Sequence, residues 1–270
     1  MNKEKILIAC LTILIAFMDV TGIPCSLLFN IQINDIEPIY FSLMINFILI
    51  GIISYFYLKL LCPKWEIGFG KVRFLTKFKK YYIIGIIISF IGFVAFLVGL
   101  LPFDNHPSIA KVIIEGIVYY IGVAIIEEFY IRGLLLNLIE IIFAKKKNCT
   151  LIAVISSAVI FGIGHIFGTL NQPIIVIISK VIWTIGMGVF LGMVYKQTKN
   201  LWVPIIFHFL INIGALPYQF STIKGYTNIT LYIIVPAYII LGIYSICELQ
   251  KCKNHPGDIV YWFLYNIIKK

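Results

Sequence analysis

The chain contains 270 residues, of which 61% are hydrophobic and 13% charged, and its formal net charge is +10. Because soluble globular proteins average roughly 25% charged residues, this composition excludes a soluble domain and predicts a single integral membrane domain, all-α and polytopic, over residues 1–270. The basic residues lie between long apolar runs and form no single patch, which indicates membrane topology and excludes a nucleic-acid-binding surface.

Eight apolar stretches follow one another along the chain, and crossing a bilayer takes about 20 such residues. We predict membrane helices at residues 6–29, 39–61, 81–101, 108–144, 151–167, 174–195, 201–216 and 229–247. The fourth is longer than one crossing at about 1.5 Å per residue, so it must tilt, break or protrude. Basic and aromatic residues alternate between the second and third spans, at 59–80, which predicts an interfacial amphipathic helix.

Loops that contain Lys and Arg alternate with loops that contain almost none. The basic residues gather before the first span, in every second loop after it, and in the C-terminal tail. Basic loops face the cytoplasm in multi-pass proteins. We therefore predict a multi-pass protein of the cell membrane with both termini in the cytoplasm. The heavy use of Ile, Lys and Asn is typical of an AT-rich, bacterial genome.

The fourth apolar stretch carries three charges within six residues, Glu127, Glu128 and Arg132. A charge at the centre of a membrane helix costs about 2.5–3.5 kcal/mol, so a function is indicated. Glu128 and Arg132 are four residues apart and can pair on one helix face. Glu127 is turned about 100° away from Glu128 and has no counter-charge nearby, as suits a general base. The alternative is that the cluster marks a helix leaving the bilayer.

Polar residues also lie inside later spans. A lone histidine in an apolar helix, such as His165, is more often a satisfied core residue than a ligand. His208 differs because Asn212 follows one turn later on the same face. An imidazole supplies a base or metal ligand, and a carboxamide can donate to a developing oxyanion. Lys180 lies near a span end, where it is expected to reach the interface, and receives no catalytic role.

These motifs, in this order, resemble the CPBP family of intramembrane proteases, which includes CAAX prenyl endopeptidases of the Rce1 type and bacterial Abi proteins. The resemblance rests on Glu127-Glu128-x-x-x-Arg132-Gly133, Phe161-x-x-x-His165 and His208-x-x-x-Asn212. It covers approximately residues 109–216, which would be the catalytic core. It implies an eight-helix transmembrane bundle of the Rce1-like type.

The resemblance also implies roles for the site residues. Glu127 and His165 would activate water, His208 and Asn212 would stabilise the oxyanion or help to hold a metal, and Glu128 and Arg132 would support the site. Glu127, His165 and His208 suit Zn²⁺ or another divalent metal, whereas Asn is a poor zinc ligand. A metal-dependent and a metal-free, glutamate-dependent mechanism therefore both stay open.

The function expected from these residues is that of an endopeptidase acting on a membrane-associated peptide or protein within the lipid bilayer. Leader-peptide or pheromone maturation and bacteriocin self-immunity are both open as its role. One alternative is a non-proteolytic partner or immunity protein that regulates a transporter or sensor kinase, although a scaffold gains nothing from buried charges. Another is a transporter or channel, which the lack of internal repeats disfavours. The sequence leaves the substrate and the oligomeric state open.

Overall fold

The computed structural model describes residues 32–41, 79–223 and 225–251. Outside these ranges it describes single residues, namely Cys10, Leu43, Ile45, Phe47, Leu49, Ile52 and Phe56. Every named element in this part of the chain is a helix. Six helical stretches in it are long and apolar enough to cross a membrane. The predicted all-α polytopic membrane protein is therefore confirmed. The first predicted span and most of the second lie outside the described residues, so the number eight stays a prediction.

The last six predicted spans correspond to these six stretches. The elements are α3 (Lys79–Gly99), α4 (Ile109–Lys111), η2 (Val112–Val118), α5 (Tyr119–Glu128), η3 (Phe129–Leu136), α6 (Asn137–Ile142), α7 (Cys149–Gly164), η4 (Phe167–Thr169), α8 (Ile174–Thr198), α9 (Trp202–Ile213), η5 (Leu216–Phe220) and α10 (Asn228–Lys251).

The elements from α4 to α6 form one continuous helical stretch of 34 residues, as the long fourth span predicted. At 1.5 Å per residue it measures about 51 Å, more than the roughly 30 Å of a bilayer core. Two parts of it, η2 and η3, are π-helical. Such wider turns are rare and occur often at functional sites. The second of them begins directly after Glu128, so the predicted acidic pair lies at the junction of two helix types.

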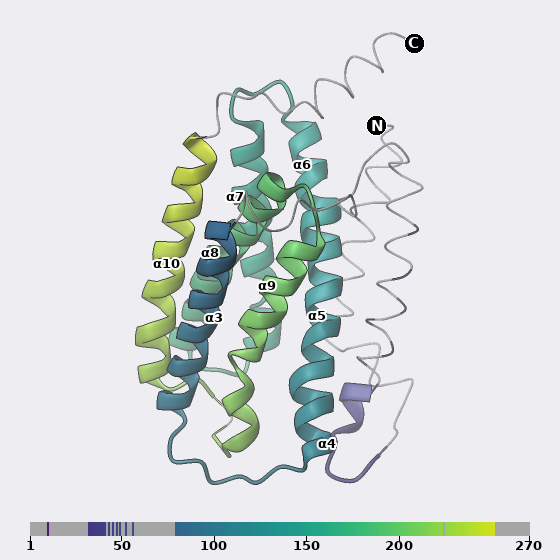
Figure 1. The fold of residues 1–270 in the computed structure, drawn as a ribbon, viewed down its shortest axis with the longest axis vertical. Helices are drawn as coiled ribbons and strands as arrows, with labels where there is room; N and C mark the ends of the chain where they lie inside the picture. Colours follow the sequence, from purple (N-terminus) through teal and green to yellow (C-terminus); the bar gives the residue numbers. More distant parts are fainter. Residues whose placement is uncertain are drawn as a thin grey trace.

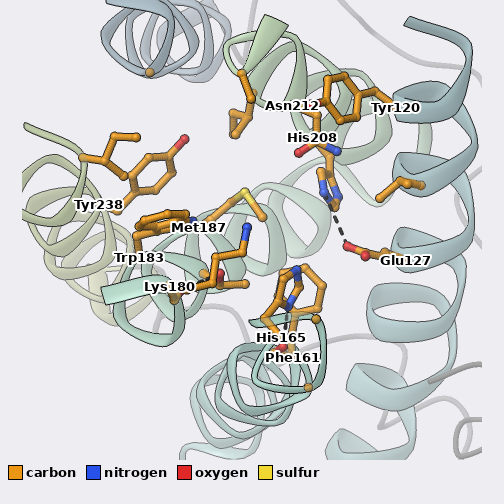
Figure 2. Close-up of a pocket in the computed structure, with 18 of the residues that line it drawn as sticks. Tyr120, Glu127, Phe161, His165, Lys180, Trp183, Met187, His208, Asn212 and Tyr238 are labelled. Atoms are coloured by element: carbon orange, nitrogen blue, oxygen red, sulfur yellow. Dashed lines mark hydrogen bonds and ion pairs between the residues drawn. The ribbon is translucent and has the colours of Figure 1, made fainter. Parts of the chain in front are cut away.

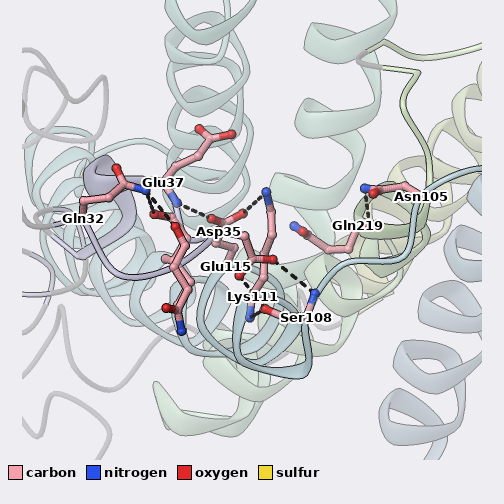
Figure 3. A network of polar contacts seen from close by, with 10 residues as sticks. Gln32, Asp35, Glu37, Asn105, Ser108, Lys111, Glu115 and Gln219 are labelled. Carbon is pink, nitrogen blue, oxygen red and sulfur yellow. Dashed lines mark hydrogen bonds and ion pairs between the residues drawn. The ribbon is translucent and has the colours of Figure 1, made fainter.

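Polar contacts hold the start of this long helix (Figure 3). The Ser108 hydroxyl accepts a hydrogen bond from the Lys111 amide and so caps the helix, as its sequence position predicts. The same hydroxyl donates to Asp35 at 2.6 Å, and the hydrogen bonds from Ser108 lower the pKa of that carboxyl below its ordinary value. Glu115 pairs with Lys111 at 3.8 Å and accepts from the Glu37 amide at 2.8 Å. The segment 32–37 is thereby bound to the helix entry.

Figure 1 shows the described membrane helices side by side, and the contacts between neighbouring helices close on themselves as a ring. Helix α5 packs against α9, α9 against α3, α3 against α10, α10 against α8, and α8 against α7. Helix α7 closes the ring by packing against η3 and α6, which continue α5. Side chains from six different helical stretches can therefore face one interior space that is shielded from lipid.

Glycines allow α8 to approach its neighbours closely. A Cβ atom on Gly186 would overlap the carbonyl oxygen of Tyr238 on α10. A Cβ atom on Gly162 of α7 would lie 3.0 Å from the carbonyl oxygen of Val181 on α8. Small residues bring membrane helices together in this way. A Cβ atom on Gly168, in contrast, would meet nothing within 4 Å, so close packing does not explain this glycine.

The two ends of the bundle differ in charge. The connections after α6 and α8 and the start of α3 lie at one end and carry Lys79, Lys80, Lys145, Lys146, Lys147 and Lys199. The loops after α3, α7 and α9 lie at the opposite end. Successive spans alternate in direction, so the loops that are rich in Lys share one end of the molecule. The orientation of that end toward the cytoplasm stays a prediction.

We expect a reporter that is active only in the cytoplasm to work when fused after Lys146, and one that is active only outside to work when fused after Asn105. The reason is that the end of the bundle with more Lys should stay on the cytoplasmic side of the membrane. The reverse pattern at these two positions would contradict the predicted topology.

Candidate active site

The ring of helices encloses a cavity of about 340 Å³, which is lined by all four residues predicted to act in catalysis (Figure 2). Glu127 comes from α5, His165 follows the end of α7, and His208 and Asn212 belong to α9. The rest of the wall is mostly apolar and aromatic, and includes Phe96, Tyr119, Tyr120, Tyr130, Phe161, Trp183, Tyr226 and Tyr238. Its volume lies within the range of roughly 300–1,000 Å³ that is typical of ligand pockets.

One oxygen atom connects three of the polar residues beside the cavity. Oε1 of Glu128 accepts a hydrogen bond from Nη1 of Arg132 at 2.7 Å and one from Nδ1 of His208 at 2.8 Å. Glu128 and Arg132 have an exposed fraction of 0%. The Glu128–Arg132 pair was predicted from its spacing. The contact between Glu128 and His208 joins residues 80 positions apart and had no signal in the sequence.

The Arg132 guanidinium has further contacts that compensate for its burial. Its Nη2 donates to the carbonyl oxygen of Gly188 on α8 at 3.3 Å. Its Cζ lies 4.7 Å from the centroid of the Phe161 ring on α7, a cation–π contact. Arg132 thus binds to α5, α7 and α8 at once, and it holds the Glu128 carboxylate in one position.

Glu128 in turn determines how His208 presents its other nitrogen. Because Nδ1 donates its proton to the carboxylate, Nε2 is the atom that faces the cavity. Nε2 lies 3.5 Å from Oε2 of Glu127. The four side chains therefore form a row in the order Glu127, His208, Glu128 and Arg132. Charges in this row alternate, and its sum is zero when His208 is protonated.

Glu127 differs from Glu128 in its partners. Its exposed fraction is 8%, and its Oε2 atom accepts no hydrogen bond from the described residues. Arg132 neutralises Glu128, whereas Glu127 faces only the imidazole of His208. It is thus the carboxylate without a cationic partner of its own, as the helix geometry predicted, and it borders the cavity.

His165 faces the cavity from the end of α7. Its Nδ1 pairs with the carbonyl oxygen of Phe161 at 2.9 Å, so this nitrogen carries the proton and Nε2 keeps its lone pair. The imidazole ring stands edge-on to the Phe161 ring, with the two centroids 4.6 Å apart. The Phe161 ring also stands edge-on to the His208 ring, with the two centroids 6.1 Å apart. Phe161 therefore lies against both histidines. Within the described part of the chain no hydrogen bond or ion pair joins His165 to Glu127.

Asn212 lies one turn beyond His208 on α9 and lines the same cavity. Its carboxamide forms no hydrogen bond with the residues that the structure describes. The amide N–H donors are thus available to a group inside the cavity.

The residues predicted to hold a metal are of types that bind metal ions, but their side chains are not arranged as a set of three ligands. Both histidines bind an acceptor through Nδ1, as histidine ligands of metals usually do. Glu127 and His208 are close together, but His165 is not joined to them. Among the described residues no group of three His, Cys, Asp or Glu side chains could hold a metal ion. The side chains as placed do not form a metal site.

One residue of the cavity wall, Lys180, was expected from the sequence to lie at the membrane interface instead. Lys180 of α8, which was expected to reach the interface, lines the cavity (Figure 2). Its Nζ lies 4.9 Å from the centroid of the Trp183 ring and 3.5 Å from the Tyr226 hydroxyl. The spacing of Lys180 and Trp183, three residues apart on one helix face, was the signal that could have revealed it.

A second cavity of about 530 Å³ adjoins the first on the side of the loops after α3, α7 and α9. Tyr120, Thr169 and Tyr226 line both. The wall of the second cavity is polar and includes Glu37, Asn105, Lys111, Glu115, Gln172 and Gln219. Polar side chains therefore lie between the first cavity and this end of the bundle.

Comparison with known proteins agrees with this arrangement. Residues 109–214 match the family model described as type II CAAX prenyl endopeptidase Rce1-like. The chain matches no curated protein and no solved structure. The matched region runs from α4 through α9, and it contains all the polar residues that lie around Glu127 and His208. Residues 109–214 are therefore similar to the Rce1-like type II CAAX prenyl endopeptidases, and this match supports an assignment to the CAAX protease (CPBP) family.

Proposed function

We propose that the protein hydrolyses a peptide bond of a membrane-associated peptide or protein, and that Glu127 is the general base that activates water. The observation that carries this proposal is the unequal pairing of the two adjacent glutamates. Arg132 neutralises Glu128, while Glu127 borders the cavity and faces Nε2 of His208 at 3.5 Å. A buried carboxylate of this kind is well suited to accept a proton.

The row of alternating charges suggests how the proton moves. Nε2 of His208 and Oε2 of Glu127 lie 3.5 Å apart, close enough to exchange one proton. When that proton is on Nε2 of His208, Glu127 is ionised and can take a proton from water. The imidazolium can then donate a hydrogen bond to the oxyanion that forms on the substrate carbonyl.

The remaining residues complete the reaction. Asn212 donates a second hydrogen bond to the oxyanion, and Nε2 of His165 accepts one from the attacking water and orients it. The hydroxide attacks the carbonyl carbon, and the tetrahedral intermediate collapses with cleavage of the C–N bond. Glu127 then delivers its proton to the departing amine, so the base regains its charge. Maturation of a leader peptide or pheromone, and self-immunity to a bacteriocin, are the proposed roles.

We expect Glu127→Gln to lower peptide cleavage by about 100-fold or more, the scale of general-base catalysis, with near-normal expression. The substitution removes the base but strands no charge, since Glu128 keeps Arg132. The cleavage rate would be measured with purified protein in liposomes and an equimolar mixture of apolar decapeptides. Mass spectrometry would identify and quantify the products. Substantial turnover by this variant would contradict the assigned role.

Arg132→Ala should lower stability as well as activity. It leaves Glu128 buried without its counter-charge, a loss that typically costs about 3–5 kcal/mol. Lys196→Ala is the matched control, because Lys196 pairs with Glu140 at 2.6 Å where both side chains are partly exposed. Melting temperatures in detergent should fall clearly further for Arg132→Ala than for Lys196→Ala. Equal melting temperatures for the two variants would show that the buried pair has no special structural role.

We also propose that catalysis proceeds through these side chains without a resident metal ion, because Glu127, His165 and His208 are not arranged as three ligands. Treatment with a strong zinc chelator followed by dialysis should therefore leave peptide cleavage close to its starting rate. Loss of activity that is restored by Zn²⁺ but not by Mg²⁺ would show that the three side chains converge on a metal during turnover.

A further inference from the structure

We propose that the Lys180 ammonium binds a carboxylate of the substrate inside the catalytic cavity; this inference rests on the proposed function. Lys180 is six residues beyond the first residue of α8, about 9 Å along the helix. It lines the same cavity as Glu127, His208 and Asn212, and Figure 2 shows its side chain directed into that space.

Aromatic side chains hold the ammonium in place. Nζ lies 4.9 Å from the Trp183 centroid and 5.8 Å from the Tyr226 centroid, and it donates to the Tyr226 hydroxyl at 3.5 Å. The two rings stand edge-to-face with centroids 4.9 Å apart. Cation–π contacts of this kind stabilise a positive charge. They position the cation, but they leave its charge unneutralised.

Lys180 differs from Arg132, Lys111 and Lys196 in having no carboxylate partner among the described residues. Arg132 pairs with Glu128, Lys111 with Glu115 and Lys196 with Glu140. The ion pairs within the described part of the chain include none to Lys180. An ammonium has three N–H donors, and Tyr226 accepts at most one or two of them. At least one N–H is left for a group in the cavity.

The charge of the cavity indicates what that group is. Lys180 contributes a positive charge to the cavity, and no carboxylate of the described cavity wall forms an ion pair with it. A cation at membrane depth is costly unless a partner compensates its charge. For a peptide substrate, the anionic groups available are the C-terminal carboxylate and the side chains of Asp and Glu. A carboxylate at Lys180 would place the chain across the cavity toward Glu127.

Lys180 could instead support the charge of Glu127 through space. The two roles differ in what they affect. A substrate-binding cation matters only for substrates with a carboxylate, whereas an electrostatic support matters for every substrate equally. Matched peptides that differ only in this group therefore separate the two.

The test uses three versions of one equimolar mixture of apolar decapeptides: with a free C-terminal carboxylate, with a C-terminal amide, and with an amide plus one internal glutamate. We expect the wild type in liposomes to cleave one carboxylate version with a kcat/KM at least about tenfold above that of the plain amide. The version preferred identifies the source of the carboxylate. Lys180→Met should lower the ratio of cleavage of that version to cleavage of the amide from about tenfold to about one.

Two further variants sharpen the comparison. Lys180→Arg should keep most of the preference, because a guanidinium also binds carboxylate. Lys145→Met, in the exposed loop after α6, removes a positive charge far from the cavity and should keep the full preference. The proposal is overturned if the wild type cleaves all three mixtures equally, or if Lys180→Met lowers cleavage of all three by the same factor.

A binding measurement keeps this inference separate from the proposed function. Equilibrium dialysis with Glu127→Gln protein compares retention of the three mixtures without cleavage. Preferential binding of one carboxylate version that Lys180→Met abolishes supports the carboxylate site, even if the wild type cleaves none of the peptides. Equal binding of all three mixtures overturns it, whatever the activity of the wild type.

Discussion

The site depends on the two hydrogen bonds that meet at Oε1 of Glu128. One comes from Arg132 in η3 and the other from His208 in α9, and both lie where water is excluded. A buried charge must be paired, so the arrangement of these side chains cannot change without a large loss of stability. The two bonds join α9 to the long helix and fix the orientation of the His208 ring. The neighbouring carboxylate, Glu127, is left to face the cavity.

The closed ring of helices makes this polar site possible within a membrane. Ionisable groups that face lipid are costly, whereas a ring of six helical stretches shields them and surrounds them with partners. The exposed outer faces carry large apolar side chains, such as Phe90 on α3 and Ile240 on α10, as contact with lipid requires. The adjoining polar cavity lies between the interior and one end of the bundle.

The Rce1-like region and the cavity do not coincide. Residues 109–214 supply the polar row, His165 and Asn212, together with Lys180. Helices α3 and α10 lie outside the matched region, yet Phe96 and Tyr238 from these helices line the cavity. The part of the chain that matches the family therefore supplies the polar residues of the cavity wall, while α3 and α10 contribute to the shape of the cavity.

Hydropathy determined the membrane class and the last six spans, because the length of an apolar run is a local property of the chain. Helical spacing likewise determined the Glu128–Arg132 pair and the isolation of Glu127 from local counter-charges. Only the tertiary structure decided which distant residues meet. It joined His208 to Glu128 across 80 positions, placed Phe161 against both histidines and turned Lys180 into the cavity. Such contacts depend on how separate helices rotate and approach one another, which no local pattern of residues contains.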